Sequence, residues 1–78
     1  MSKFELREIG KDWEEDGTLL SNHSTLELAE KQMNIEASKR VKKVYYVRKT
    51  EYANEKFWVY DYGLYNRFLK IKEVEQWF

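Results

Sequence analysis

Aromatic and basic side chains interleave in one part of this chain, and this combination is well suited to binding another molecule. Phe, Trp and Tyr make up 17% of the 78 residues, and most of them follow residue 44. Bases are frequent in the same part, while no acid occurs among residues 37–50. Aromatic rings stack on nucleic-acid bases beside cations that neutralise phosphates, and Tyr, Trp and Arg are also common anchors of protein interfaces. The pattern therefore predicts a binding surface.

The residues of this surface follow from strand geometry, because successive side chains of a strand point to opposite faces of the sheet. If residues 41–62 form a hairpin, one of its faces carries Tyr45, Val47, Phe57 and Val59. We expect the helix to cover that face because it is the less charged, which leaves the other face to a partner. The predicted partner-binding residues are Tyr46, Trp58, Tyr60, Tyr62, Lys42, Lys43, Arg48 and Lys49.

This surface has three interpretations. The one we favour is a protein partner or self-association, with Trp58 and Tyr60 as anchors. The alternative is single-stranded nucleic acid, whose bases would stack on the rings while the lysines and arginine contact phosphates. Against that alternative, the chain has no RNP-type motif, and its pI of about 6.6 is far below the values typical of such domains. In the third interpretation the rings belong to the core and lysine stems lie over them.

Nucleophilic catalysis has few candidate residues here. The chain has no cysteine and one histidine, His23, whose nearest serines are Ser21 and Ser24. Catalytic partners normally converge from distant parts of a chain, which fixes their geometry. We therefore interpret His23 as a loop residue before the helix and expect a protein that is not an enzyme and has no catalytic residues.

A cluster of acids is the remaining candidate site. Asp12, Glu14, Asp16 and Gly17 have the spacing of the first part of an EF-hand calcium loop. The glutamate that closes such a loop and sets its affinity is replaced by His23. We expect a solvated acidic loop, no metal site and no cofactor, since the three isolated glycines also give no phosphate-binding loop.

These residues must be positioned by a small set of elements. Alternation and periodicity predict a strand over 3–9, a loop over 10–23, a helix over 24–39 and strands over 41–49 and 55–62. The start of the helix rests on the capping-box pattern of residues 24–27.

The C-terminal part is less regular. We expect a short strand near 65–71, followed by a helical turn over 73–78 with Trp77 and Phe78 docked on the domain. The whole chain, residues 1–78, then forms one α+β domain in β-α-β-β order, with one helix packed on a small antiparallel sheet.

Composition and charge indicate where in the cell the protein is expected to act. The absence of cysteine fits the cytoplasm, no apolar run approaches the length of a membrane span, and the first residues have no signal-peptide core. Residues 1–36 hold four bases and nine acids, whereas residues 37–78 hold ten bases and five acids. We expect a cytoplasmic accessory protein without a membrane partner. Its size and composition also suit a protein encoded by a phage or prophage.

Overall fold

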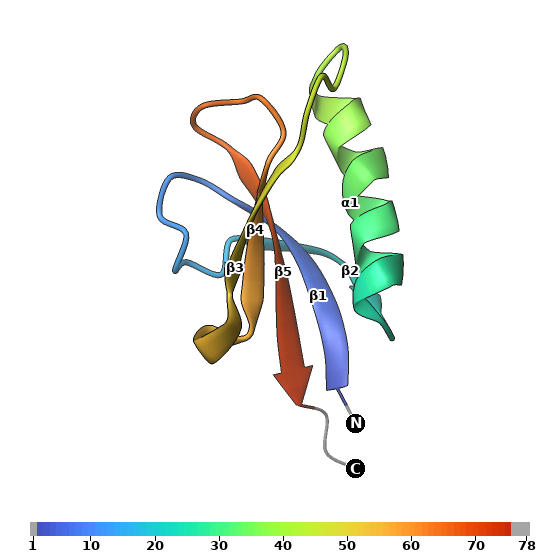
Figure 1. Ribbon diagram of the computed structural model, residues 1–78, viewed down its shortest axis with the longest axis vertical. Coiled ribbons are helices and arrows are strands. Elements are labelled where there is room, and N and C mark those ends of the chain that lie inside the picture. The colour runs from blue at the N-terminus through green and yellow to red at the C-terminus, as the bar shows by residue number, and fades with distance from the viewer. Residues whose placement is uncertain (1, 76–78) are drawn as a thin grey trace.

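The computed structural model describes residues 2–75, apart from the side chain of Ala53. Over these residues, one helix packs on a five-stranded antiparallel sheet of order β2-β1-β5-β4-β3 (Figure 1). The elements are β1 (Ser2–Ile9), β2 (Thr18–His23), α1 (Leu26–Arg40), β3 (Arg48–Tyr52), the short 3-10 helix η1 (Ala53–Glu55), β4 (Phe57–Asp61) and β5 (Phe68–Glu75). The predicted α+β class, with one helix on a small antiparallel sheet, is confirmed.

The predicted loop over residues 10–23 is wrong in its second half, which forms the edge strand β2. Leu6 pairs with Ser21 and Arg7 with Leu19, so Leu20 is an extra residue in β2. Such a bulge interrupts the alternation of side chains. The sequence signal of a strand is therefore missing from β2.

The predicted strand over 41–49 is also wrong, because β3 begins only at Arg48. Residues 41–47 form an irregular connection in which Val41, Val44 and Val47 pack against the core. A spacing of three residues does not fit the two-residue period of a strand. The valines therefore hold this segment to the domain without pairing it into the sheet.

The C-terminal strand is longer than expected. Glu73 pairs with Phe4 and Glu75 with Ser2, so the helical turn predicted from residue 73 is wrong for residues 73–75. The rest of that turn, and the predicted docking of residues 77–78, lie outside the described residues.

The helix α1 begins at Leu26, two residues later than predicted. Thr25 is its N-cap, and the Thr25 hydroxyl accepts a hydrogen bond of 3.1 Å from the backbone N–H of Leu28. The buried residues of the helix are Ala29, Met33 and Ala37, at helical spacing on the side that faces the sheet. The two small alanine side chains let the helix backbone approach the sheet.

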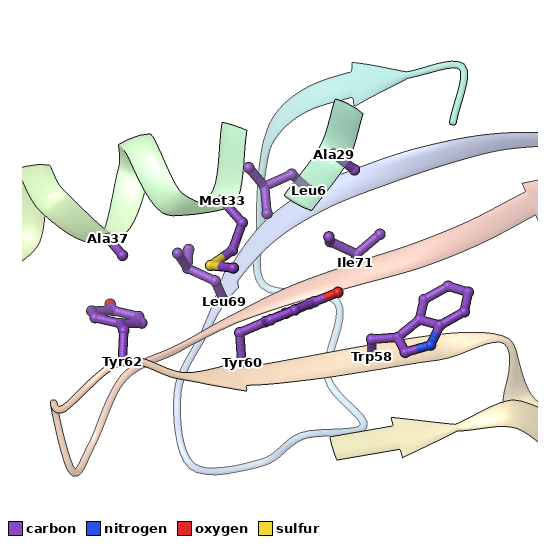
Figure 2. Packing of buried hydrophobic residues seen from close by; sticks show 9 residues of the cluster. All are labelled: Leu6, Ala29, Met33, Ala37, Trp58, Tyr60, Tyr62, Leu69 and Ile71. Atoms are coloured by element: carbon purple, nitrogen blue, oxygen red, sulfur yellow. The ribbon is translucent and has the colours of Figure 1, made fainter. Parts of the chain in front are cut away.

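The main core lies between the helix and the sheet, as Figure 2 shows for nine buried residues. This core contains the rings of Trp58 and Tyr60 from β4 and of Tyr62, which directly follows β4. The helix therefore covers the face of these three rings, and the expectation that it covers the face of Phe57 and Val59 is wrong. Charge did not identify the covered face, in part because Lys42 and Lys43 lie in the connection 41–47, which is not part of the sheet; Arg48 and Lys49 belong to β3.

The opposite face of the sheet is closed by the β1–β2 connection, residues 10–17. The Trp13 ring lies over the rings of Phe68 and Tyr52 in edge-to-face geometry, with centroid distances of 5.3 and 6.1 Å. Lys70 is buried beneath this connection and donates hydrogen bonds to the carbonyl oxygens of Trp13 and Glu15, at 2.9 and 3.0 Å. Burial lowers the pKa of Lys70, and two carbonyl groups take the place of water around its ammonium group.

We expect Trp13→Ala to destabilise the fold by about 2 kcal/mol, less than for a fully buried aromatic residue because Trp13 is half-buried. The midpoint and slope of urea unfolding measure the change. Tyr65→Ala is the matched control, since its ring is exposed, and its unfolding free energy should stay within about 0.5 kcal/mol of the parent. Equal stability of the two variants would contradict a structural role for the 10–17 connection.

Candidate binding surface

Three of the eight predicted partner-binding residues are core residues. Trp58 is 9% exposed, Tyr60 1% and Tyr62 2%. The Tyr60 hydroxyl donates a hydrogen bond of 2.7 Å to Glu30 of the helix. The structure therefore does not present these rings to a partner, and the expectation that they form an exposed face is wrong.

The other five predicted residues lie in the connection after the helix and at the start of β3. We call residues 41–49 the basic segment. Lys42, Lys43, Tyr46 and Arg48 are exposed, because the valines between them turn inward. The fifth predicted residue, Lys49, is tied to the helix by an ion pair with Glu30, in which Nζ lies 2.7 Å from the carboxylate. Four of the predicted residues thus form one outward-facing set.

Tyr45 was assigned to the covered face by its sequence position, and this assignment is wrong. Its ring is 80% exposed, and the Lys43 ammonium nitrogen lies 5.0 Å from the ring centroid. The spacing of Val41, Val44 and Val47 was the signal that could have identified it, because a three-residue spacing of buried side chains leaves adjacent tyrosines outside.

A second exposed tyrosine lies in the connection between β4 and β5, residues 62–67. Tyr65 is 80% exposed, and Lys11 from the 10–17 connection places its ammonium nitrogen 4.7 Å from the ring centroid. Tyr65 and Lys11 were not among the predicted binding residues. Their contact joins two connections that are far apart in the sequence, which no local pattern could indicate.

The connections 41–47 and 62–67 lie at the end of the domain away from the two termini, and the 10–17 connection starts after Ile9 near this end and lies at the side of the sheet (Figure 1). Residues 41–47 follow the C-terminal end of α1, and Ile9 pairs with Phe68 at the same end of the sheet. We call this region the loop end. It brings both lysine–tyrosine contacts to one end of the molecule.

A network of ion pairs fixes the elements at the loop end. Glu8 of β1 accepts a hydrogen bond of 2.6 Å from Arg40 Nε and lies 3.6 Å from Arg67 Nη1. Arg40 Nη1 lies 2.7 Å from the Glu36 carboxylate, and this hydrogen bond lowers the pKa of Glu36. The helix, the first strand and the 62–67 connection are therefore held together by alternating charges. Burial raises the pKa of Tyr62, whose hydroxyl has no hydrogen-bond partner among residues 2–75.

The acidic cluster is engaged within its own connection. The Glu15 carboxylate accepts a hydrogen bond of 2.6 Å from the Gly10 N–H, and that of Asp12 accepts one of 3.1 Å from the Glu14 N–H. Asp16 lies 3.2 Å from Lys72 Nζ, and this contact lowers the pKa of Asp16. Among residues 2–75, no group of three or more His, Cys, Asp or Glu side chains is arranged to hold a metal ion.

Two other features have a chemical interpretation. The Ser21 hydroxyl lies 2.8 Å from His23 Nε2, because alternate residues of β2 share a face, but no group hydrogen-bonds His23 Nδ1 in the described part of the chain. A shallow hollow of about 400 Å³ between the connections 10–17 and 62–67 is lined by Glu8, Ile9, Gly10, Glu15, Gly17, Thr18, Asn66 and Arg67. The serine–histidine pair does not line this hollow.

No helix within residues 2–75 is long and apolar enough to cross a membrane. No protein-family model matches the chain, and comparison with curated proteins and with solved structures likewise finds no match. The function must therefore be argued from the geometry of the loop end.

Glu30 should contribute to the pH dependence of stability, because it anchors both Tyr60 and Lys49 to the helix. Burial alone would raise the pKa of Glu30, but hydrogen bonds from Lys49 and Tyr60 outweigh it and hold the pKa below its ordinary value of 4.5. A depressed carboxyl pKa stabilises the fold above about pH 4.5, and this contribution disappears as pH falls through the folded-state value.

Glu30→Gln should therefore remove part of the loss of stability between neutral and acidic pH, measured as the unfolding free energy at each pH. Glu55→Gln is the control, because no ion pair of Glu55 occurs among the described residues. If the unfolding free energy of Glu30→Gln falls at acidic pH as much as that of the parent, this role of Glu30 is refuted.

Proposed function

We propose that this is a binding protein without catalytic activity, which contacts the phosphate backbone of a nucleic acid through the basic segment. The observation that carries this proposal is that Lys42, Lys43 and Arg48 are exposed and form no ion pair within the described part of the chain. Cations that form no ion pair are free to neutralise phosphates. Three inward valines hold the same segment in a defined course, so its cations need little further ordering.

The near-neutral pI is a weaker objection to this proposal once the charges are placed in the fold. Part of the negative charge is neutralised or engaged away from the basic segment, as in the ion pair between Asp16 and Lys72 and the hydrogen bond between Gly10 and Glu15. Electrostatic attraction depends on the local distribution of charge as well as on the net charge. An anionic strand that approaches the basic segment therefore meets a positive surface.

The second candidate function is binding of a protein partner or self-association, which the sequence favoured. The buried rings no longer support it, but Leu28 and Ile35 do, because both are exposed large apolar residues, seven positions apart on the helix. Residues at this separation lie on one side of a helix. We further propose a cytoplasmic location, because the chain has no cysteine. A phage or prophage origin is also part of this proposal.

Lys42→Gln/Lys43→Gln should weaken the binding of a labelled short oligonucleotide, measured by fluorescence anisotropy at several salt concentrations. Removal of one phosphate contact should reduce the slope of log affinity against log salt by about 0.7 for a single strand. Lys31→Gln/Lys56→Gln removes the same charge at exposed sites outside the basic segment and is the matched control.

Equal weakening in the two double variants would contradict the basic segment as the contact surface. If no oligonucleotide binds and the protein sediments as a dimer, the second candidate function replaces the first. In that case Leu28→Gln/Ile35→Gln should restore the monomer.

A further inference from the structure

We infer that the loop end selects single-stranded over double-stranded nucleic acid, with the rings of Tyr45 and Tyr65 as two separate stacking platforms for unpaired bases. This inference rests on the proposed function and adds to it the class of nucleic acid and two residues outside the predicted set. It is carried by the two lysine–tyrosine contacts and by their common location.

Each platform consists of a strongly exposed ring with a cation above it. Tyr45 and Tyr65 are both 80% exposed, and the nearest ammonium nitrogens lie 5.0 and 4.7 Å from their centroids. A lysine in this position can occupy only one face of a ring, so the other face is open to a planar group. The same lysine places a positive charge next to the site where the phosphate of a stacked nucleotide would lie.

The two platforms belong to one end of the molecule. Tyr45 lies in the connection after α1 and Tyr65 in the connection between β4 and β5, and both connections lie at the loop end (Figure 1). Glu8 links them indirectly, because it binds Arg40 at the end of the helix and Arg67 beside Tyr65. A single strand that passes over the loop end can therefore reach both rings.

The exposure of these rings distinguishes them from the other tyrosines of the sheet region. Tyr60 and Tyr62 are buried in the core, and Tyr52 stacks on Phe57 with a centroid distance of 4.6 Å. Those rings contribute to stability through burial, whereas Tyr45 and Tyr65 leave most of their surface in water. Rings exposed in this way are available for stacking on a planar group.

Stacking explains the preference for a single strand. The bases of a duplex are already stacked on each other, and inserting a side chain between them costs about a few kcal/mol per step. Unpaired bases offer their faces without this cost, and every base has such a face. The loop end should therefore bind single strands with little dependence on sequence.

The test compares three anionic probes by competition against a labelled single strand of oligo-dT. The probes are unlabelled oligo-dT, a closed DNA duplex without free ends, and inorganic polyphosphate, which has charge but no bases. We expect oligo-dT to compete best. Tyr45→Ala and Tyr65→Ala should each weaken oligo-dT binding roughly 5- to 150-fold, which corresponds to about 1–3 kcal/mol per stacked base.

Tyr45→Phe and Tyr65→Phe are the matched controls, since they keep the ring and should keep the affinity. Equal competition by the three probes, or alanine variants that bind as the parent does, would overturn the inference while leaving the proposed function in place. Absence of salt-dependent binding to any probe would instead overturn the proposed function, and the inference with it.

Discussion

The packing of α1 on one face of the sheet is the interaction on which the rest of this structure depends. In Figure 2, Ala29 lies near Leu6, Met33 points towards Leu69 and Ala37 lies above the Tyr62 ring, so the small alanine side chains let the helix approach the sheet. The Tyr60 hydroxyl, which would be costly to bury alone, donates to Glu30, and Glu30 in turn binds Lys49. This packing buries the rings of Trp58, Tyr60 and Tyr62 in the core. It also fixes where the chain leaves the helix, so that the basic segment crosses towards β3 with its cations outward.

A second constraint is that the sheet has two apolar faces and the described chain has one helix. The 10–17 connection closes the other face with Trp13, and buried Lys70 holds two of its carbonyl groups. The edges of the sheet are protected in two different ways. β2 carries a bulge at Leu20, while β3 carries the charged residues Arg48, Lys49 and Glu51.

The sequence predicted the fold class, the helix, the first strand and β4, because each of these has a clear period. It did not predict β2, since the bulge at Leu20 breaks the alternation, or the irregular course of residues 41–47, since valine and tyrosine favour strands. As a result, Tyr45 was expected on the face covered by the helix and the rings of β4 on the exposed face, whereas the structure shows the reverse. Five of the predicted binding residues are nevertheless exposed on the basic segment, and four of them are not tied to the helix. The contact between Lys11 and Tyr65 joins distant connections, so only the tertiary structure could reveal it.

The tyrosines divide into a buried set and an exposed set, and chemical modification can distinguish the two. Nitration of the folded protein with tetranitromethane, followed by mass spectrometry of its peptides, gives a rate for each tyrosine. We predict fast modification of Tyr45 and Tyr65 and protection of Tyr60 and Tyr62, which are buried and whose pKa values burial raises. Modification of Tyr60 and Tyr62 as fast as that of Tyr45 would show that the helix does not cover this face, and would contradict the account.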